Sequence, residues 1–247
     1  TALCYRESSG FAFLFTAVLC FLLGKAATFR KPKNTVFYGR EGFVTVSMCW
    51  IVLSIFGALP FLLNGDIPSV PDALFETVSG FTTTGSTILT DIESLSKCSL
   101  FWRSFTHWIG GMGVLVFVLA VLPIAGGGSQ MYLMRAESPG PSVNKLVPRV
   151  KNTAMILYGI YIVITIIEII LLLIGGMPLF DALTSAFGTA GTGGFGIKND
   201  SFASYSVFCQ GVVSIFMILF GINFNIYYLL LCKKHKQAFQ SDELRMY

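Results

Sequence analysis

The chain has 247 residues, of which 54% are hydrophobic and 12% are charged, and it carries a net charge of +4 at pH 7. A mean hydropathy of +0.71 excludes an ordinary soluble domain, because such a domain could not cover this much apolar surface with polar residues. The composition therefore indicates an integral membrane protein.

Five apolar runs approach or reach the roughly 20 residues that span a bilayer core, and we expect five transmembrane helices. In chain order these runs cover residues 11–29, 43–63, 100–123, 153–174 and 207–232. Two segments between them, 72–87 and 181–196, contain helices too short to span, and we expect both to be re-entrant. The predicted fold class is an all-α integral membrane protein with five transmembrane helices and two pore helices.

The two short segments are an internal repeat. DALFETVSGFTTTGST (72–87) aligns without a gap with DALTSAFGTAGTGGFG (181–196), 109 residues further on. Each predicts an amphipathic helix of about ten residues, with proline and aspartate near its start. Each also lies between two long apolar runs, so a unit of helix, re-entrant pore loop and helix occurs twice.

Each short helix ends in a run of glycine and threonine, where an extended backbone can turn successive carbonyls toward an ion. The partial negative charge at the helix C-terminus would favour a cation there. Such backbone is tolerated at membrane depth only where it lines a wet cavity or is buried in protein. We therefore predict a filter that binds K⁺ through backbone carbonyls, with no transition-metal site, at Thr82, Thr83, Thr84, Gly85, Gly191, Thr192, Gly193 and Gly194.

Basic residues predict the orientation, because Lys and Arg accumulate in cytoplasmic loops. Thirteen of the 17 fall in the segments 25–40, 131–151 and 233–245, which we place inside. The outer face would then carry four basic and eight acidic residues, Glu76 and Arg103 among them, and would concentrate cations at a pore mouth. The positive net charge follows from this topology, so we expect no nucleic-acid partner.

Glu168 lies within an otherwise apolar helix, where a charge is costly unless it is paired or hydrated. Arg103 or His107 could reach it, and we favour a structural ion pair over a direct role on the ion pathway. Three glycines of another predicted helix form a smooth face, for which we favour close packing over a gating hinge; they are Gly110, Gly111 and Gly113.

Two patterns that suggest other functions lack their required context. Residues 191–196 fit G-x-G-x-x-G, but the dinucleotide fingerprint needs a preceding strand and a βαβ unit, and here a short helix precedes it. The six cysteines have no CxxC spacing, and no nucleophile–base pair stands out. We expect neither a zinc site, nor a disulfide framework, nor an enzyme.

Five motifs follow one another along nearly the whole chain: FETVSGFTTTGST (75–87), HWIGGMGVLVFVLAVLP (107–123), RAESPGP (135–141), GTAGTGGFG (188–196) and GINFN (221–225). Together they resemble the TrkH/KtrB-type potassium transport subunits of the superfamily of K⁺ transporters. The resemblance implies four non-identical repeats around a pseudo-fourfold axis, with Gly85 and Gly194 as the filter glycines of the first two. It also implies K⁺ as the transported ion, no tightly bound cofactor, a homodimer in the lipid bilayer of the plasma membrane, and a cytosolic nucleotide-binding regulatory subunit.

On this resemblance the chain divides into five parts. They are an extra N-terminal transmembrane helix with a basic loop (1–40), a first pore repeat (41–130), a cytoplasmic linker (131–151), a second pore repeat (152–235), and a tail or the start of a third repeat (236–247). Since the third and fourth repeats are missing, we expect a fragment that supplies half a filter. The predicted function is potassium transport as the membrane subunit of a Trk/Ktr-type system. The alternatives are a non-conducting membrane scaffold or assembly fragment, and a Na⁺-permeable member of the family.

Overall fold

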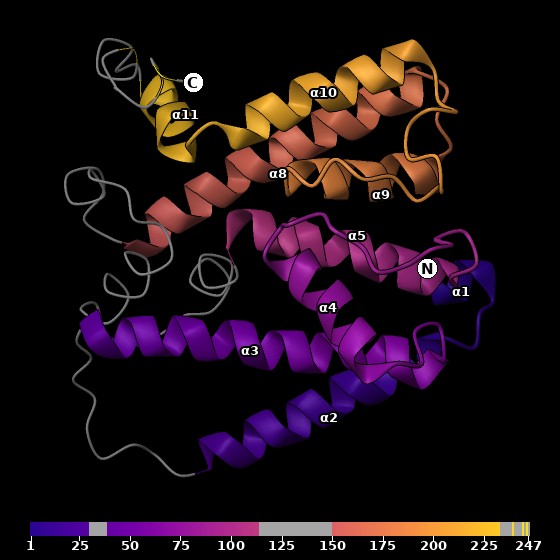
Figure 1. Ribbon diagram of the computed structural model, residues 1–247. Coiled ribbons are helices and arrows are strands. Elements are labelled where there is room, and N and C mark those ends of the chain that lie inside the picture. Colours follow the sequence, from indigo (N-terminus) through magenta and orange to yellow (C-terminus); the bar gives the residue numbers. More distant parts are fainter. Residues whose placement is uncertain (30–38, 114–149, 233–238, 240–243, 245, 247) are drawn as a thin grey trace.

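The computed structural model describes residues 1–29, 39–113, 150–232, 239, 244 and 246 (Figure 1). The regular elements within these residues are all helices, which confirms the expected all-α class. In chain order they are α1 (Ala2–Tyr5), α2 (Gly10–Thr28), α3 (Gly39–Asn64), α4 (Val70–Phe81), α5 (Lys97–Met112), α8 (Val150–Ile174), α9 (Leu179–Ala190), α10 (Val207–Gly221) and α11 (Phe224–Leu231).

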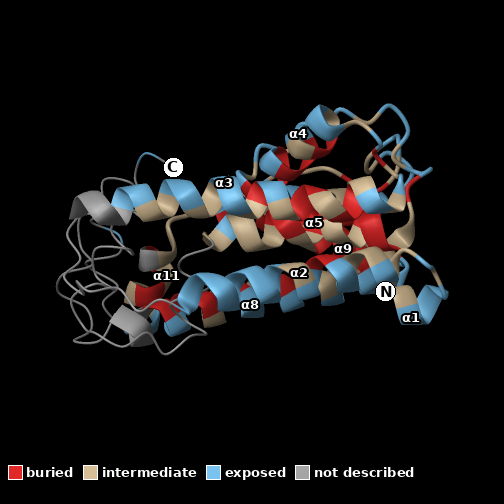
Figure 2. Ribbon diagram, turned by 90° about the horizontal axis from the view of Figure 1, so that it is seen from below, coloured by how far each residue is buried: buried red, intermediate tan, exposed pale blue. Residues whose placement is uncertain are grey.

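Three stretches are long and apolar enough to cross a membrane: Gly10–Thr28, Phe43–Asn64 and Ala154–Ile174, which lie in α2, α3 and α8. Their outward faces carry large exposed apolar side chains, such as Phe21 and Ile170, as surface in contact with lipid would. Figure 2 shows this exposed surface along α2, α3 and α8, with the buried residues gathered toward α5 and α9.

The other two expected spans differ from the prediction. α5 has 16 residues, and the remainder of the run 100–123 lies outside the described residues. The run 207–232 forms two helices, α10 and α11, instead of one continuous span. The described residues therefore contain three helices long and apolar enough to span a membrane, where the sequence predicts five over the whole chain.

The break between α10 and α11 has a local cause. Ile222 leaves the helical conformation, with φ −69° and ψ 136°, and its neighbours Gly221 and Asn223 are both poor helix formers. The Tyr227 hydroxyl donates to the Leu219 carbonyl at 2.7 Å, which satisfies a backbone acceptor in the last turn of α10.

The helices form two similar units, α3–α4–α5 and α8–α9–α10, and in each a 12-residue helix packs against two other helices. α4 and α9 are the two short helices that the sequence predicts. α5 packs against α9 as well as α4, so the units are joined through the centre of the molecule (Figure 1). α2 lies against α3 at one side.

The same local signals start the helices of both units. α4 and α9 carry Asp72 and Asp181 in their first turns, where an acid is stabilised by the helix dipole. Ser96 and Ser206 cap α5 and α10, and each side chain accepts the backbone N–H three residues further on, at 3.3 Å. The internal repeat is thus a repeat of helix boundaries as well as of residues.

Candidate functional site

The loops that follow α4 and α9 have matching positive φ angles at two aligned positions. We call residues 82–87 loop A and residues 191–196 loop B. Thr83 has φ 55° and the aligned Thr192 has φ 56°, while Gly85 has φ 79° and the aligned Gly194 has φ 65°. A β-branched residue rarely adopts positive φ, so the threonines hold strain on the order of 1–3 kcal/mol. The same unusual conformation at aligned positions indicates that the two loops have the same role.

Matching hydrogen bonds hold these conformations. The residue before each strained threonine ends its helix with nearly identical angles, Thr82 at φ −81° and ψ 1°, and Gly191 at φ −79° and ψ 5°. The loop amides then return to carbonyls in the last turn of each helix, as in a Schellman cap. These bonds are Thr83 N to Gly80 O (3.0 Å) and Thr84 N to Ser79 O (2.9 Å) after α4, and Thr192 N to Thr189 O (2.7 Å) and Gly193 N to Gly188 O (3.0 Å) after α9.

The two loops touch. A Cβ atom built on Gly85 would lie 2.8 Å from the carbonyl oxygen of Gly193 and 3.3 Å from its Cα. Further along loop A, the Ser86 carbonyl accepts the Ser79 hydroxyl at 2.6 Å, so it is engaged with α4. The structure therefore brings the two predicted filter segments into contact at Gly85 and Gly193, and the Ser86 carbonyl is hydrogen-bonded to α4.

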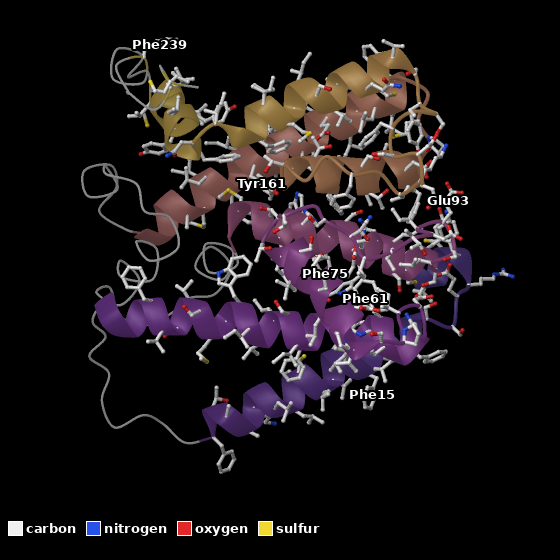
Figure 3. The ribbon with its side chains drawn as sticks, in the orientation of Figure 1. Phe15, Phe61, Phe75, Glu93, Tyr161 and Phe239 are labelled. Carbon is white, nitrogen blue, oxygen red and sulfur yellow. The ribbon has the colours of Figure 1, made fainter. Side chains whose placement is uncertain are left out.

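α5 packs closely behind both loops. A Cβ atom on Gly110 would lie 2.3 Å from the Phe81 carbonyl oxygen, and one on Gly111 would lie 2.5 Å from the Tyr161 hydroxyl. That hydroxyl donates to the Trp108 carbonyl at 2.8 Å, and Figure 3 shows Tyr161 on α8 beside the end of α5. The expectation of close packing holds for these two glycines.

His107 is part of the wall behind loop B and does not lie at an interface with water. It is 3% exposed, its ring centroid lies 4.3 Å from that of Phe195, and a Cβ atom on Gly193 would lie 2.9 Å from the imidazole Nδ1. Nδ1 has no hydrogen-bond partner among the described residues. The ring therefore acts as a spacer against the loop backbone.

Glu76 and Arg103 are buried, although the sequence placed them among the charges of an outer face. Both are 3% exposed, and they form an ion pair through Oε1 and Nε. Glu76 also accepts the Thr87 hydroxyl at 2.9 Å and the Ile88 backbone N–H at 3.2 Å. One signal could have revealed this: Glu76 shares the buried face of α4 with Ala73, Thr77 and Gly80 at helical spacing.

The expected ion pair of Glu168 with Arg103 or His107 is also wrong. Glu168 is fully buried on α8, and neither carboxyl oxygen has a hydrogen-bond partner in the described part of the chain. The Thr189 hydroxyl lies beside the carboxyl but donates to the Ser185 carbonyl at 2.8 Å. The prediction failed because α5 directs Arg103 toward α4 of its own unit.

At the end of the molecule where α4 and α9 begin, polar side chains join the two units. The Asn199 side chain donates to Asp91 at 2.8 Å and accepts the Ile92 N–H at 2.7 Å, while its backbone N–H donates to Glu93 at 3.1 Å. Two acids of the expected outer face, Asp91 and Glu93, therefore hold loops of the two units together.

Comparison with known proteins decides the family. The family model described as TrkH, cation transport protein, matches residues 9–245. This chain belongs to the TrkH family. The Trk system potassium uptake proteins TrkH of Salmonella typhimurium and TrkG of Escherichia coli are 38% and 36% identical to it, each over the whole chain and 52% of the relative. The family members named here are transporters and not enzymes.

A solved structure agrees with this assignment. The crystal structure of the potassium transporter TrkH from Vibrio parahaemolyticus superposes with a TM-score of 0.75 at 32% identity, over 94% of this chain and 47% of that one. This TrkH-family chain thus spans about half the length of the relatives that it matches.

Proposed function

We propose that the chain supplies two of the pore loops through which a potassium uptake transporter of the TrkH family selects K⁺. The observation that carries the proposal is the pair of loops with matching left-handed positions at Thr83 and Gly85, and at Thr192 and Gly194. Thr84, between them, lies outside the left-handed region. Alternating backbone conformations let successive carbonyls face one side, which a string of cation sites requires.

The chemistry of the loops suits a monovalent cation. The groups near the contact of the two loops are backbone carbonyls and threonine hydroxyls, including the Thr82 and Thr84 hydroxyls 2.8 Å apart. Such neutral oxygens can replace hydration water without binding the ion too tightly to release it. We assign K⁺ and not Na⁺ as the transported ion because the relatives are named as potassium uptake proteins.

Two loops leave roughly half of a coordination shell open. We propose that two further repeats complete the ring, in keeping with relatives about twice as long as this chain. A homodimer in the plasma membrane and a cytosolic nucleotide-binding subunit belong to the same proposal. That subunit would face the basic segment 131–151 and the tail; residues 131–149 of this segment lie outside the described residues.

Growth at low external K⁺ tests this function. We expect the intact transporter that contains this chain to restore growth of a host that lacks K⁺ uptake, whereas the 247-residue chain alone should not.

Flux through purified and reconstituted protein is the second test. The chain as a monomer should show no selective K⁺ flux, because its filter is half a ring. Selective flux from the monomer would refute the half-filter proposal, and failure of the intact protein to move K⁺ would refute the function. Flux without K⁺/Na⁺ discrimination would favour the Na⁺-permeable alternative.

Orientation is tested by cysteine labelling with an impermeant reagent, on a background that lacks the six native cysteines. We expect a cysteine at Lys198, beside the joined loops, to react from outside in sealed cells, and one at Lys145 to react only after permeabilisation. Labelling of position 145 from outside would reverse the proposed orientation.

A further inference from the structure

We propose that Arg103 is a positioning residue that holds loop A and loop B at a fixed separation, through a buried network that starts at Glu76. The inference rests on the proposed function, because it assigns the spacing of the two filter loops to one arginine. It concerns α5, a helix outside both loops, and a residue pair outside the eight candidate filter residues.

At one end, the network is hydrogen-bonded to loop A and to the residue that follows it. The Glu76 carboxylate accepts from the Thr87 hydroxyl and the Ile88 backbone N–H, at the point where loop A leaves the contact with loop B. Its remaining capacity is used by Arg103, with both side chains at most 3% exposed. A carboxylate with three donors in a buried site is held in one position.

At the other end, the network contacts loop B. Arg103 Nη1 donates to the Gly196 carbonyl at 3.5 Å, and the guanidinium carbon lies 4.2 Å from the centre of the Phe195 ring. Phe195 and Gly196 directly follow Gly194, and Gly196 is aligned with Thr87, the residue of loop A that Glu76 contacts. A planar guanidinium has five N–H donors in a fixed fork and a flat face that stacks on a ring, a geometry that the compact ammonium of lysine does not reproduce.

The second unit has no such pair of its own. The position aligned with Glu76 is Ser185, and the position in α10 that lies as far from the cap Ser206 as Arg103 lies from the cap Ser96 is Val213; both are buried. Because loop B lacks a carboxylate and an arginine from its own unit, it takes its support from the arginine of the first. One buried ion pair thus serves two loops, and its loss should change the distance between them more than it changes either helix.

The test compares K⁺ and Na⁺ flux in the intact transporter, reconstituted in vesicles, with thermal unfolding measured on the same preparations. In Glu76→Gln/Arg103→Met, both charges are removed together, so no unpaired charge stays buried and the fold should survive. Gln keeps an acceptor for Thr87 and Ile88, but Met has no N–H group to donate to the Gly196 carbonyl. We expect unfolding near that of wild type and a K⁺/Na⁺ ratio that falls about threefold to tenfold, as for the loss of one long hydrogen bond.

Arg103→Lys keeps the charge beside Glu76 but loses the contacts with loop B, so its ratio should also fall. Glu7→Gln is the matched control, since Glu7 accepts two backbone N–H groups at the start of the same helix, from Lys97 and Cys98, and contacts neither loop. The control should keep the wild-type ratio.

A double variant with wild-type unfolding and a wild-type ratio would overturn the proposal and leave the ion pair a purely structural role. If the double variant does not fold, Arg103→Lys decides alone, and an unchanged ratio there overturns the proposal equally. Absence of selective flux in the wild type would instead overturn the proposed function, and the role of Arg103 with it.

Discussion

Gly85→Ala is expected to abolish most of the discrimination between K⁺ and Na⁺ in the intact transporter. Gly85 has φ 79°, and its added Cβ would lie 2.8 Å from the Gly193 carbonyl oxygen. That contact is with backbone, so loop B must shift to remove the clash, and the shift moves carbonyls of both loop A and loop B. The measurement is the K⁺/Na⁺ permeability ratio of reconstituted protein.

Gly65→Ala separates this effect from the cost of the backbone conformation. Gly65 has φ 74°, nearly that of Gly85, but nothing lies within 4 Å of its added Cβ. Both variants therefore carry a left-handed alanine, at a cost of about 1–2 kcal/mol, and only Gly85→Ala displaces loop B.

Gly194→Ala should have a smaller effect on the ratio than Gly85→Ala, because its Cβ meets the flexible end of Met217 at 2.8 Å. Equal ratios for Gly85→Ala and Gly65→Ala would remove Gly85 from the filter.

Gly110→Ala is expected to destabilise the whole assembly of helices. Its Cβ would lie 2.3 Å from the Phe81 carbonyl oxygen and 2.9 Å from the carbonyl carbon, at the end of α4. No side chain can turn aside to relieve the contact, so α5 has to move away from α4. Overpacking of this kind costs typically 1–3 kcal/mol and occasionally more. Thermal unfolding in detergent measures it.

Gly159→Ala is the control for that experiment. Gly159 lies within α8, and nothing is within 4 Å of its added Cβ. Alanine favours the helix over glycine by up to about 1 kcal/mol, so this variant should match or exceed the wild type. If the two glycine variants unfold at the same temperature, α5 does not depend on contact with α4 at this point.

The short helices and their loops could be predicted because their signals are local. Proline and aspartate in the first turn, a few turns of amphipathic pattern and a glycine–threonine run each act within one segment. The continuous span expected from 207–232 was wrong because apolar length alone does not register Gly221 and Asn223, which break the helix between α10 and α11. Hydropathy predicts burial in lipid, and the continuity of a helix depends on other properties.

By itself, the sequence determined the membrane class, the internal repeat and the position of the candidate filter, since composition, apolar length and residue order are properties of the chain alone. Only the tertiary structure decided the partners of the buried charges. Glu76 and Arg103 are 27 residues apart, and the packing of α4 on α5 brings them together. Glu168 remains without a hydrogen-bond partner among the described residues because the same packing turns Arg103 away from it. Charge signs allow many pairings over such separations, and the three-dimensional arrangement of the helices selects one.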